Sequence, residues 1–247
     1  MTHAIRRPPP VSATLARGGA VSRNQVLEWE SRRIAAVAQK LELATPTGDI
    51  ADRRQRLLEA KLSLGPARLR ELLARETLWS DRLARLMVRF HPAARRTSVC
   101  EIRVDGGTAA DFATWFTQRT PLGDVPGMLG ACPDHYVIEQ AADGSLAVLE
   151  TAGGSLLAAL FYIDYEDISS LVTPPDPRFA HQIAGVARTE NGTPIGGVRH
   201  QFRNLDAGGF EGRLTVEFPW FSLPLMLRQH EWHLACEFSN WIEASLQ

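Results

Sequence analysis

A series of short β-type runs, separated by turn residues, occupies the second half of the chain and constrains its fold more than any other feature. Asp143-Gly144 and Asn191-Gly192 are strong hairpin signals between neighbouring runs. Pro224 then opens a long helix that runs almost to the last residue. The runs cover residues 136–140, 146–151, 156–164, 181–189, 197–204 and 213–218.

One more strand and a helix precede these runs. Residues 98–104 read as a strand, and Thr108 is a suitable N-cap for a helix that holds Phe112, Trp115 and Phe116. The order is therefore strand, helix, several antiparallel strands and a long C-terminal helix. This order predicts the α+β class, with a curved antiparallel sheet wrapped around a helix and a cavity between them, the helix-grip arrangement in residues 96–247.

The N-terminal part is expected to be helical. Residues 1–21 read as a flexible tail, and residues 22–95 as a helical segment with helices at 22–43, 50–64 and 66–90. Gly65 ends one helix, and Pro66 suits the first turn of the next. An apolar stripe on this last helix requires a partner surface, either the other helices or a second copy of the chain in a homodimer. The stripe contains Leu69, Leu72, Leu73, Leu83, Leu86 and Met87.

Charge divides the chain near residue 95. Residues 1–100 hold 19 Lys and Arg against 9 Asp and Glu, while the rest holds 8 against 19. The basic and acidic parts can attract each other or a neighbouring copy. The arginines alternate with apolar residues at helical spacing and do not cluster beside aromatic residues, so no nucleic-acid partner is expected.

The number of cysteines and the lengths of the apolar runs bear on the cellular compartment in which the protein is expected. The three cysteines Cys100, Cys132 and Cys236 are odd in number and widely spaced, which disfavours a disulfide framework and favours reducing conditions. The sequence has no apolar run of the length that a membrane helix needs, and its start lacks the apolar segment of a secretory signal. We therefore expect a soluble, cytoplasmic protein without a membrane partner.

The final helix carries His230, His233 and Glu237. Positions four apart share a helix face, so the imidazole of His233 and the carboxylate of Glu237 can bind one divalent ion. The alternative is that these polar side chains form only the solvated face of the helix. His230 has no carboxylate one turn further on, so His233 is the preferred ligand.

Three further positions can complete such a site. His135 follows Cys132-Pro133-Asp134 at the entrance to a strand, Glu166 lies just after an apolar run, and His200 sits within a strand. Each also has a simpler interpretation, as a turn residue, a member of an exposed acidic run and an outward-facing strand histidine. Taken together, they can converge only in the cavity of the predicted fold.

The order of several short motifs resembles that of a known family. These are Gly107-Thr108 through Trp115-Phe116, then residues 132–135, then residues 200–204 with Gly209 and 211–213, and finally His-x-x-x-Glu at 233–237. Over residues 97–247 the chain resembles the zinc-dependent 2,4-diacetylphloroglucinol hydrolases and the related phloretin hydrolases. The resemblance implies a Bet v 1/START-like helix-grip domain that cuts a carbon–carbon bond between an aromatic ring and an acyl group.

Carried over by position, the resemblance implies a Zn²⁺ ion held by His135, Glu166, His233 and Glu237. Asp164 and Asp167 are neighbours that can compete with Glu166. Two imidazoles and two carboxylates are donors that zinc accepts. The approach to the first histidine, residues 128–131, departs from the family, whose members tend to have aromatic residues there, so the substrate stays open.

The leading hypothesis is therefore a zinc hydrolase that removes an acyl group from a polyphenol-like small molecule. Zinc would polarise the acyl carbonyl and lower the pKa of a water molecule, with His200 as the acid–base residue. Tyr136, Tyr162 and Tyr165 are candidate contacts to the phenol. The rival hypotheses are a metal-free carrier of apolar or phenolic ligands, and a regulator whose second part senses a phenolic ligand.

Overall fold

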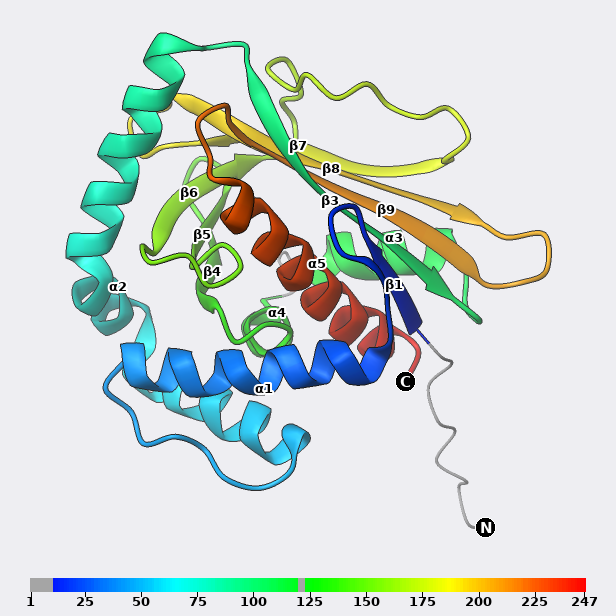
Figure 1. Cartoon of the computed structure of the whole chain (residues 1–247), viewed down its shortest axis with the longest axis horizontal. Helices are drawn as coiled ribbons and strands as arrows, with labels where there is room; N and C mark the ends of the chain where they lie inside the picture. The colour runs from blue at the N-terminus through cyan, green and yellow to red at the C-terminus, as the bar shows by residue number, and fades with distance from the viewer. Residues whose placement is uncertain (1–10, 120–122) are drawn as a thin grey trace.

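The computed structural model describes residues 11–119 and 123–247, and in them the chain forms an α+β fold around one antiparallel sheet (Figure 1). The sheet has nine strands in the order β2-β1-β3-β9-β8-β7-β6-β5-β4 and is not closed. The predicted α+β class is confirmed. The strands are β1 (Val11–Leu15), β2 (Gly19–Val21), β3 (Arg95–Val104), β4 (His135–Gln140), β5 (Leu146–Glu150), β6 (Ala159–Asp164), β7 (His181–Arg188), β8 (Pro194–Asn204) and β9 (Phe210–Pro219).

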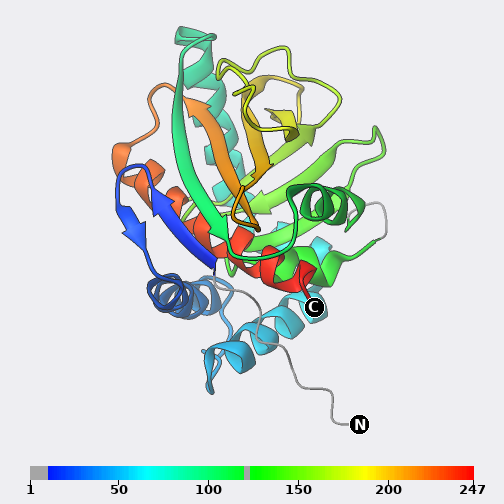
Figure 2. The ribbon, with the colours of Figure 1, turned by 90° about the vertical axis from the view of Figure 1, so that its right-hand side faces the viewer.

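The helices lie on both sides of this sheet. The C-terminal helix α5 runs across one face, where it packs against β3 and β1 (Figure 1). Helix α1 lies beside the first part of α2, and the later part of α2 runs along β6 (Figures 1 and 2). No helix in the described ranges combines the length and apolar character needed to cross a membrane. The helices are α1 (Arg23–Lys40), α2 (Ile50–Phe90), α3 (Ala109–Arg119), α4 (Val125–Gly130) and α5 (Pro224–Ser245).

Local signals in the sequence determine many of the boundaries. Gly144 and Gly192 adopt positive φ angles of 88° and 82° in the two predicted hairpins, β4–β5 and β7–β8. Ser22 caps α1 in a capping box with Gln25. Gly65 has a φ of 73° and kinks α2 at the predicted break between two helices.

The expected flexible tail at residues 1–21 requires a correction. Residues 11–21 form β1 and β2, and β1 pairs along its length with β3. Val11, Ala13 and Leu15 alternate with exposed residues, as a half-buried strand requires. The sequence did not predict this strand, because an alternation of apolar and polar residues over only five positions is a weak signal. Residues 1–10 of the expected tail lie outside the described residues.

The helical segment and the sheet share one of the two hydrophobic cores. This core joins Ile34 and Val37 of α1 and Leu69 of α2 to Tyr136 and Leu149 of the sheet. Residues 22–95 therefore do not form a core of their own. The other core lies between the sheet, α3 and α5.

The predicted attraction between the basic and acidic parts is visible as ion pairs within the chain. Arg17 pairs with Glu231 at 2.6 Å, and Arg23 pairs with Glu243 at 2.6 Å. Each pair joins the N-terminal part to α5.

Candidate metal centre and its cavity

Two histidines and two glutamates converge where β4, β5 and α5 meet. His135 Nε2 lies 3.2 Å from His233 Nε2, 3.1 Å from a carboxylate oxygen of Glu237 and 3.7 Å from one of Glu150. His233 Nε2 lies 3.5 Å from Glu237 and 3.7 Å from Glu150. All four residues are buried. His135 and Glu150 are cross-strand neighbours, and His233 and Glu237 lie one helical turn apart.

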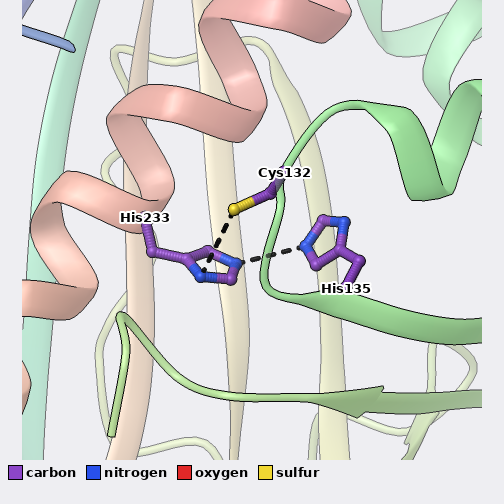
Figure 3. A group of neighbouring side chains, drawn as sticks. All are labelled: Cys132, His135 and His233. Atoms are coloured by element: carbon purple, nitrogen blue, oxygen red, sulfur yellow. Dashed lines mark hydrogen bonds between the residues drawn. The ribbon is translucent and has the colours of Figure 1, made fainter. Parts of the chain in front are cut away.

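A buried cysteine joins the same two histidines in a group that can hold a metal ion. One donor atom each of Cys132, His135 and His233 lie within 4.8 Å of one another (Figure 3). Cys132 Sγ lies 3.7 Å from His233 Nδ1, on the other side of the ring from the nitrogen that approaches His135. A single ion cannot bind both nitrogens of one imidazole. An ion at His233 Nε2 would therefore have the two carboxylates near it as well.

The spacing of the donors fits a tetrahedral ion. Zinc binds imidazole nitrogen and carboxylate oxygen at about 2.1 Å, so tetrahedral donors lie about 3.4 Å from each other. The distances from His135 and His233 to the surrounding donors, 3.1–3.7 Å, bracket that value. Two neutral imidazoles with two carboxylates would also balance the charge of a divalent cation in a buried place.

The backbone contact of His135 is made by Nδ1, which leaves Nε2 facing the other donors of the cluster. Its Nδ1 lies 3.2 Å from the backbone oxygen of Met128, to which an N–H at that position can donate. This tautomer presents the lone pair of Nε2 to the cluster. Trp241 stacks on the same ring at a centroid distance of 5.7 Å and restricts its rotation.

The electrostatics of the cluster favour a charged carboxylate at Glu237 next to a protonated His233. Burial alone would raise the pKa of Glu237, but His233 and His135 outweigh it and hold that pKa below its usual value. Burial lowers the pKa of His233, but Cys132, Glu150 and Glu237 outweigh it and raise that pKa well above the usual value. Burial raises the pKa of Glu150. A proton and a metal ion therefore compete for the same donors.

His200 lies in the same cavity with an unusual environment. It is buried on β8 and meets the ring of Phe238 edge-on at 4.8 Å. Among the described residues, no group forms a hydrogen bond with its Nδ1. Desolvation lowers the pKa of His200 to about 4, against an opposing effect of Glu237, so the ring is neutral at pH 7. A neutral imidazole that lines a cavity can accept a proton or a hydrogen bond from a ligand.

The low pKa of His200 predicts a specific loss of stability in acid. An unfolded histidine has a pKa of about 6.5, so the unfolded chain binds the proton first. The stabilising contribution is complete above about pH 6.5 and is lost as the pH falls towards the folded pKa of about 4. Between pH 7 and 4.5, we expect wild type to lose about 2 kcal/mol more than His200→Gln in urea unfolding at equal metal loading. Parallel pH profiles for the two proteins would contradict this assignment.

The N-terminal helices hold the loop that carries His135. Lys61 of α2 is fully buried, and its Nζ donates to the backbone oxygens of His135 at 2.7 Å and of Leu129 and Pro133 at 3.4 Å. Burial lowers the pKa of Lys61 to about 8. The three carbonyl contacts fix the chain on both sides of the turn that leads into β4.

A second contact fixes the same turn from α1. Arg33 donates to both carboxylate oxygens of the buried Asp134, at 2.9 and 2.7 Å. Thr151, just after β5, also donates to Asp134. Because His135 follows Asp134 and Glu150 precedes Thr151, this network sets the positions of two residues of the cluster.

The loop after β5 packs closely against α5. Gly153 has a φ of 60°, and a Cβ at this position would lie 2.3 Å from the backbone carbon of Gln229. Its N–H approaches His233 Nδ1 at 3.4 Å. Only glycine allows the loop to come this close to the turn of α5 that carries the cluster.

A cavity of about 720 Å³ opens from the cluster towards the later part of α2. His135, Glu150, His200, His233 and Glu237 lie at its inner end. Leu83, Leu156, Phe221, Leu223 and Leu225 line it as well and are at least half exposed, so they mark its mouth.

The structure brings together three of the four metal ligands implied by the resemblance, His135, His233 and Glu237. It does not bring Glu166 to them. Glu166 is exposed in the turn after β6, where its N–H donates to Asp164. The carboxylate beside the histidines belongs to Glu150, which is a correction to the expected set. His200 does line the cavity, as expected.

The three tyrosines lie in different places. Tyr165 lines the cavity. Tyr136 is buried in the core shared with α1 and α2, where its hydroxyl meets Thr151 at 3.1 Å. Tyr162 alternates along β6 with Phe161 and Ile163, which line the cavity, so it points to the other face. Tyr136 and Tyr162 therefore do not line the cavity in which the phenol contacts were expected.

His230, the histidine of the final helix that was not preferred as a ligand, is buried. Its Nδ1 lies 3.0 Å from the hydroxyl of Ser98, and its ring stacks on His233 with an interplanar angle of 10°. Burial lowers its pKa well below the usual value. It therefore supports the ring of His233 in an uncharged form.

The sequence contained a signal for each of two residues that were not predicted, Glu150 and Lys61. Leu146, Val148 and Glu150 share one face of a strand by its period of two, so the carboxylate points with the apolar residues. Lys61 similarly occupies a helical position that continues the buried pair Leu57 and Leu58. A charged residue on an apolar face indicates a buried partner.

No protein-family model matches the chain, and a search of curated proteins gives no significant match. The fold and the site thus define the chain as an α+β protein with an internal cavity and a buried Cys/His/His group that can hold a metal ion.

Proposed function

We propose that this protein is a zinc-dependent hydrolase with a helix-grip fold, which cleaves the carbon–carbon bond between an acyl group and a phenolic ring. The observation that carries the proposal is the convergence of His135, Glu150, His233 and Glu237 at the inner end of a ligand-sized cavity. Three of these residues match the motif order of the acylphloroglucinol hydrolases that the sequence resembles.

The four donors would hold the ion, and the remaining side chains of the cavity would orient the substrate. Zinc supplies Lewis-acid chemistry, which polarises a carbonyl group and makes water more acidic. Trp241 and Phe238 form an aromatic wall for a phenolic ring. Tyr165 is the tyrosine that remains available for a phenol contact.

His200 is the proposed acid–base residue. The reaction adds the hydroxyl of water to the acyl carbon and a hydrogen to the ring carbon, so one group must move a proton between them. His200 is neutral and lines the cavity, so its imidazole can accept that proton and return it to the ring carbon. Hydroxyls ortho and para to the broken bond stabilise the departing ring.

Metal content measured with turnover tests this function. Wild-type protein purified without chelator is expected to contain about one zinc per chain and to release a carboxylic acid from an acylphloroglucinol. His233→Ala should lose both properties, while His181→Ala, the same change at the edge of β7, should keep both. A His233→Ala protein that retained its full zinc content would rule out the assignment.

A metal-free carrier is the second candidate, and the largely apolar lining of the cavity favours it. Without an ion, the histidines and glutamates can pair with each other as buried acid–base partners. Protein that binds acylated phenols without zinc and without turnover would support the carrier and exclude the hydrolase.

A further inference from the structure

Most of the ionisable side chains that line the cavity gather at its inner end. The inner end contains the two histidines and two glutamates of the proposed metal site together with the imidazole of His200. The middle and the mouth are lined mainly by apolar side chains such as Val148, Phe161 and Met87. A ligand that fits this distribution has one polar end and a long apolar end.

Three of the polar side chains along the rest of the cavity already have partners within the protein. Gln229 accepts a hydrogen bond from Trp29 at 3.3 Å, and Ser155 donates to the backbone oxygen of Leu157 at 2.7 Å. Glu217 accepts from the N–H groups of Val172 and Thr173 at 2.7–3.1 Å. A ligand with hydroxyls spread over its whole length would therefore leave many of them without a partner.

The size of the cavity also favours a ligand with a long apolar end. At about 720 Å³, it falls within the range of roughly 300–1,000 Å³ that binds drug-sized molecules. A hydroxylated ring with an acetyl group would fill the inner end and leave the apolar outer part empty. Empty apolar space forgoes contacts that a longer ligand would make.

We infer that the ligand of this cavity is a phenolic ketone with an apolar chain of about six or more carbons, which extends from the inner end to the mouth at Leu83 and Leu223. The ketone group in this inference rests on the proposed function. The apolar chain of the ligand rests on the shape and lining of the cavity alone. The chain can be the acyl group itself or a substituent of the ring, since both offer the same apolar surface.

Binding of a chain-length series tests the inference separately from turnover. The probes are 4-alkylresorcinols with two, six and eight carbons, in which a methylene replaces the carbonyl, so they have no acyl bond to cleave. Burial of a methylene strengthens binding by at most about fourfold. We expect the dissociation constant, measured by calorimetry on the full-length protein as purified, to fall at least tenfold from ethyl to octyl.

A variant at the mouth provides a second readout. Leu83→Glu places a charge where the chain would leave the cavity, at a side chain that is already 50% exposed, so folding should tolerate it. It should weaken octylresorcinol binding at least fivefold and leave ethylresorcinol binding unchanged. Leu62→Glu, at a 41% exposed position of the same helix outside the cavity lining, is the control and should change neither.

Two kinds of ketone then show where the ligand carries its apolar chain, one with the chain in the acyl group and one with the chain on the ring. Faster cleavage of an octanoyl than of an acetyl resorcinol assigns the chain to the acyl group, and faster cleavage of a ring-hexylated acetyl resorcinol assigns it to the ring. A dissociation constant that changes less than threefold from ethyl to octyl overturns the inference, even if short ketones are cleaved. Chain-dependent binding without zinc or cleavage supports the inference while the proposed function fails.

Discussion

Replacing Glu150 with glutamine is expected to lower the zinc affinity of the protein by at least about a hundredfold, while Glu166→Gln should leave it unchanged. Glu150 lies 3.7 Å from the Nε2 atoms of both His135 and His233, whereas Glu166 is exposed beyond β6. Glutamine keeps the shape of the side chain but removes the charge that would balance the ion. The affinity is measured by competition with a chromophoric chelator.

Cys132→Ser is the matched comparison, because Cys132, His135 and His233 form the other group of donors that can hold an ion. Cys132 Sγ approaches His233 from its Nδ1 side, and burial raises the pKa of this thiol well above its usual value. If the ion sits among the carboxylates, Cys132→Ser should retain zinc. The near-ultraviolet spectrum of the cobalt-substituted wild-type protein should then lack a strong sulfur-to-metal band. If Cys132→Ser lost zinc and Glu150→Gln kept it fully, the ion would have to bind at the Cys/His/His group instead of among the carboxylates.

The sequence predicted elements that depend on local chemistry. The hairpins at Gly144 and Gly192 and the kink at Gly65 need positive φ angles that glycine adopts readily, so each was visible from one or two residues. Pro224 opens α5 because a proline at the first helical position loses no hydrogen bond. The His233–Glu237 pair was also local, because helical spacing alone places both side chains on one face.

The features that the sequence did not predict depend on contacts between distant residues. β1 is stable only because it pairs with β3, some ninety residues further along the chain. Glu150 faces inward with its strand, but a buried carboxylate there requires α5 to bring His233 next to it. Tyr136 was expected to contact a phenol, yet its side chain lies in the core that β4 shares with α1 and α2. None of these partners can be identified from spacing alone.

Asp134→Asn is expected to reduce the free energy of unfolding by about 3 kcal/mol, because it removes one charge of a buried ion pair. Asp134 is fully buried and accepts two hydrogen bonds from Arg33 and one from Thr151. Asparagine has nearly the same shape, but its amide group would turn a donor towards one of these donors. Urea unfolding of both proteins, at equal metal loading, measures the difference.

The exposed pair Arg68–Glu71 on α2 is the control for this substitution. It has a similar distance of 2.7 Å, but its side chains are 50% and 71% exposed, so Glu71→Gln should cost less than about 0.5 kcal/mol. Asp134→Asn should also weaken zinc binding, because Asp134 fixes the turn before His135 and the strand end at Glu150. Equal unfolding free energies for Asp134→Asn and wild type would mean that the contact with α1 does not hold this turn. The helical segment would then have no part in positioning the candidate metal centre through Arg33.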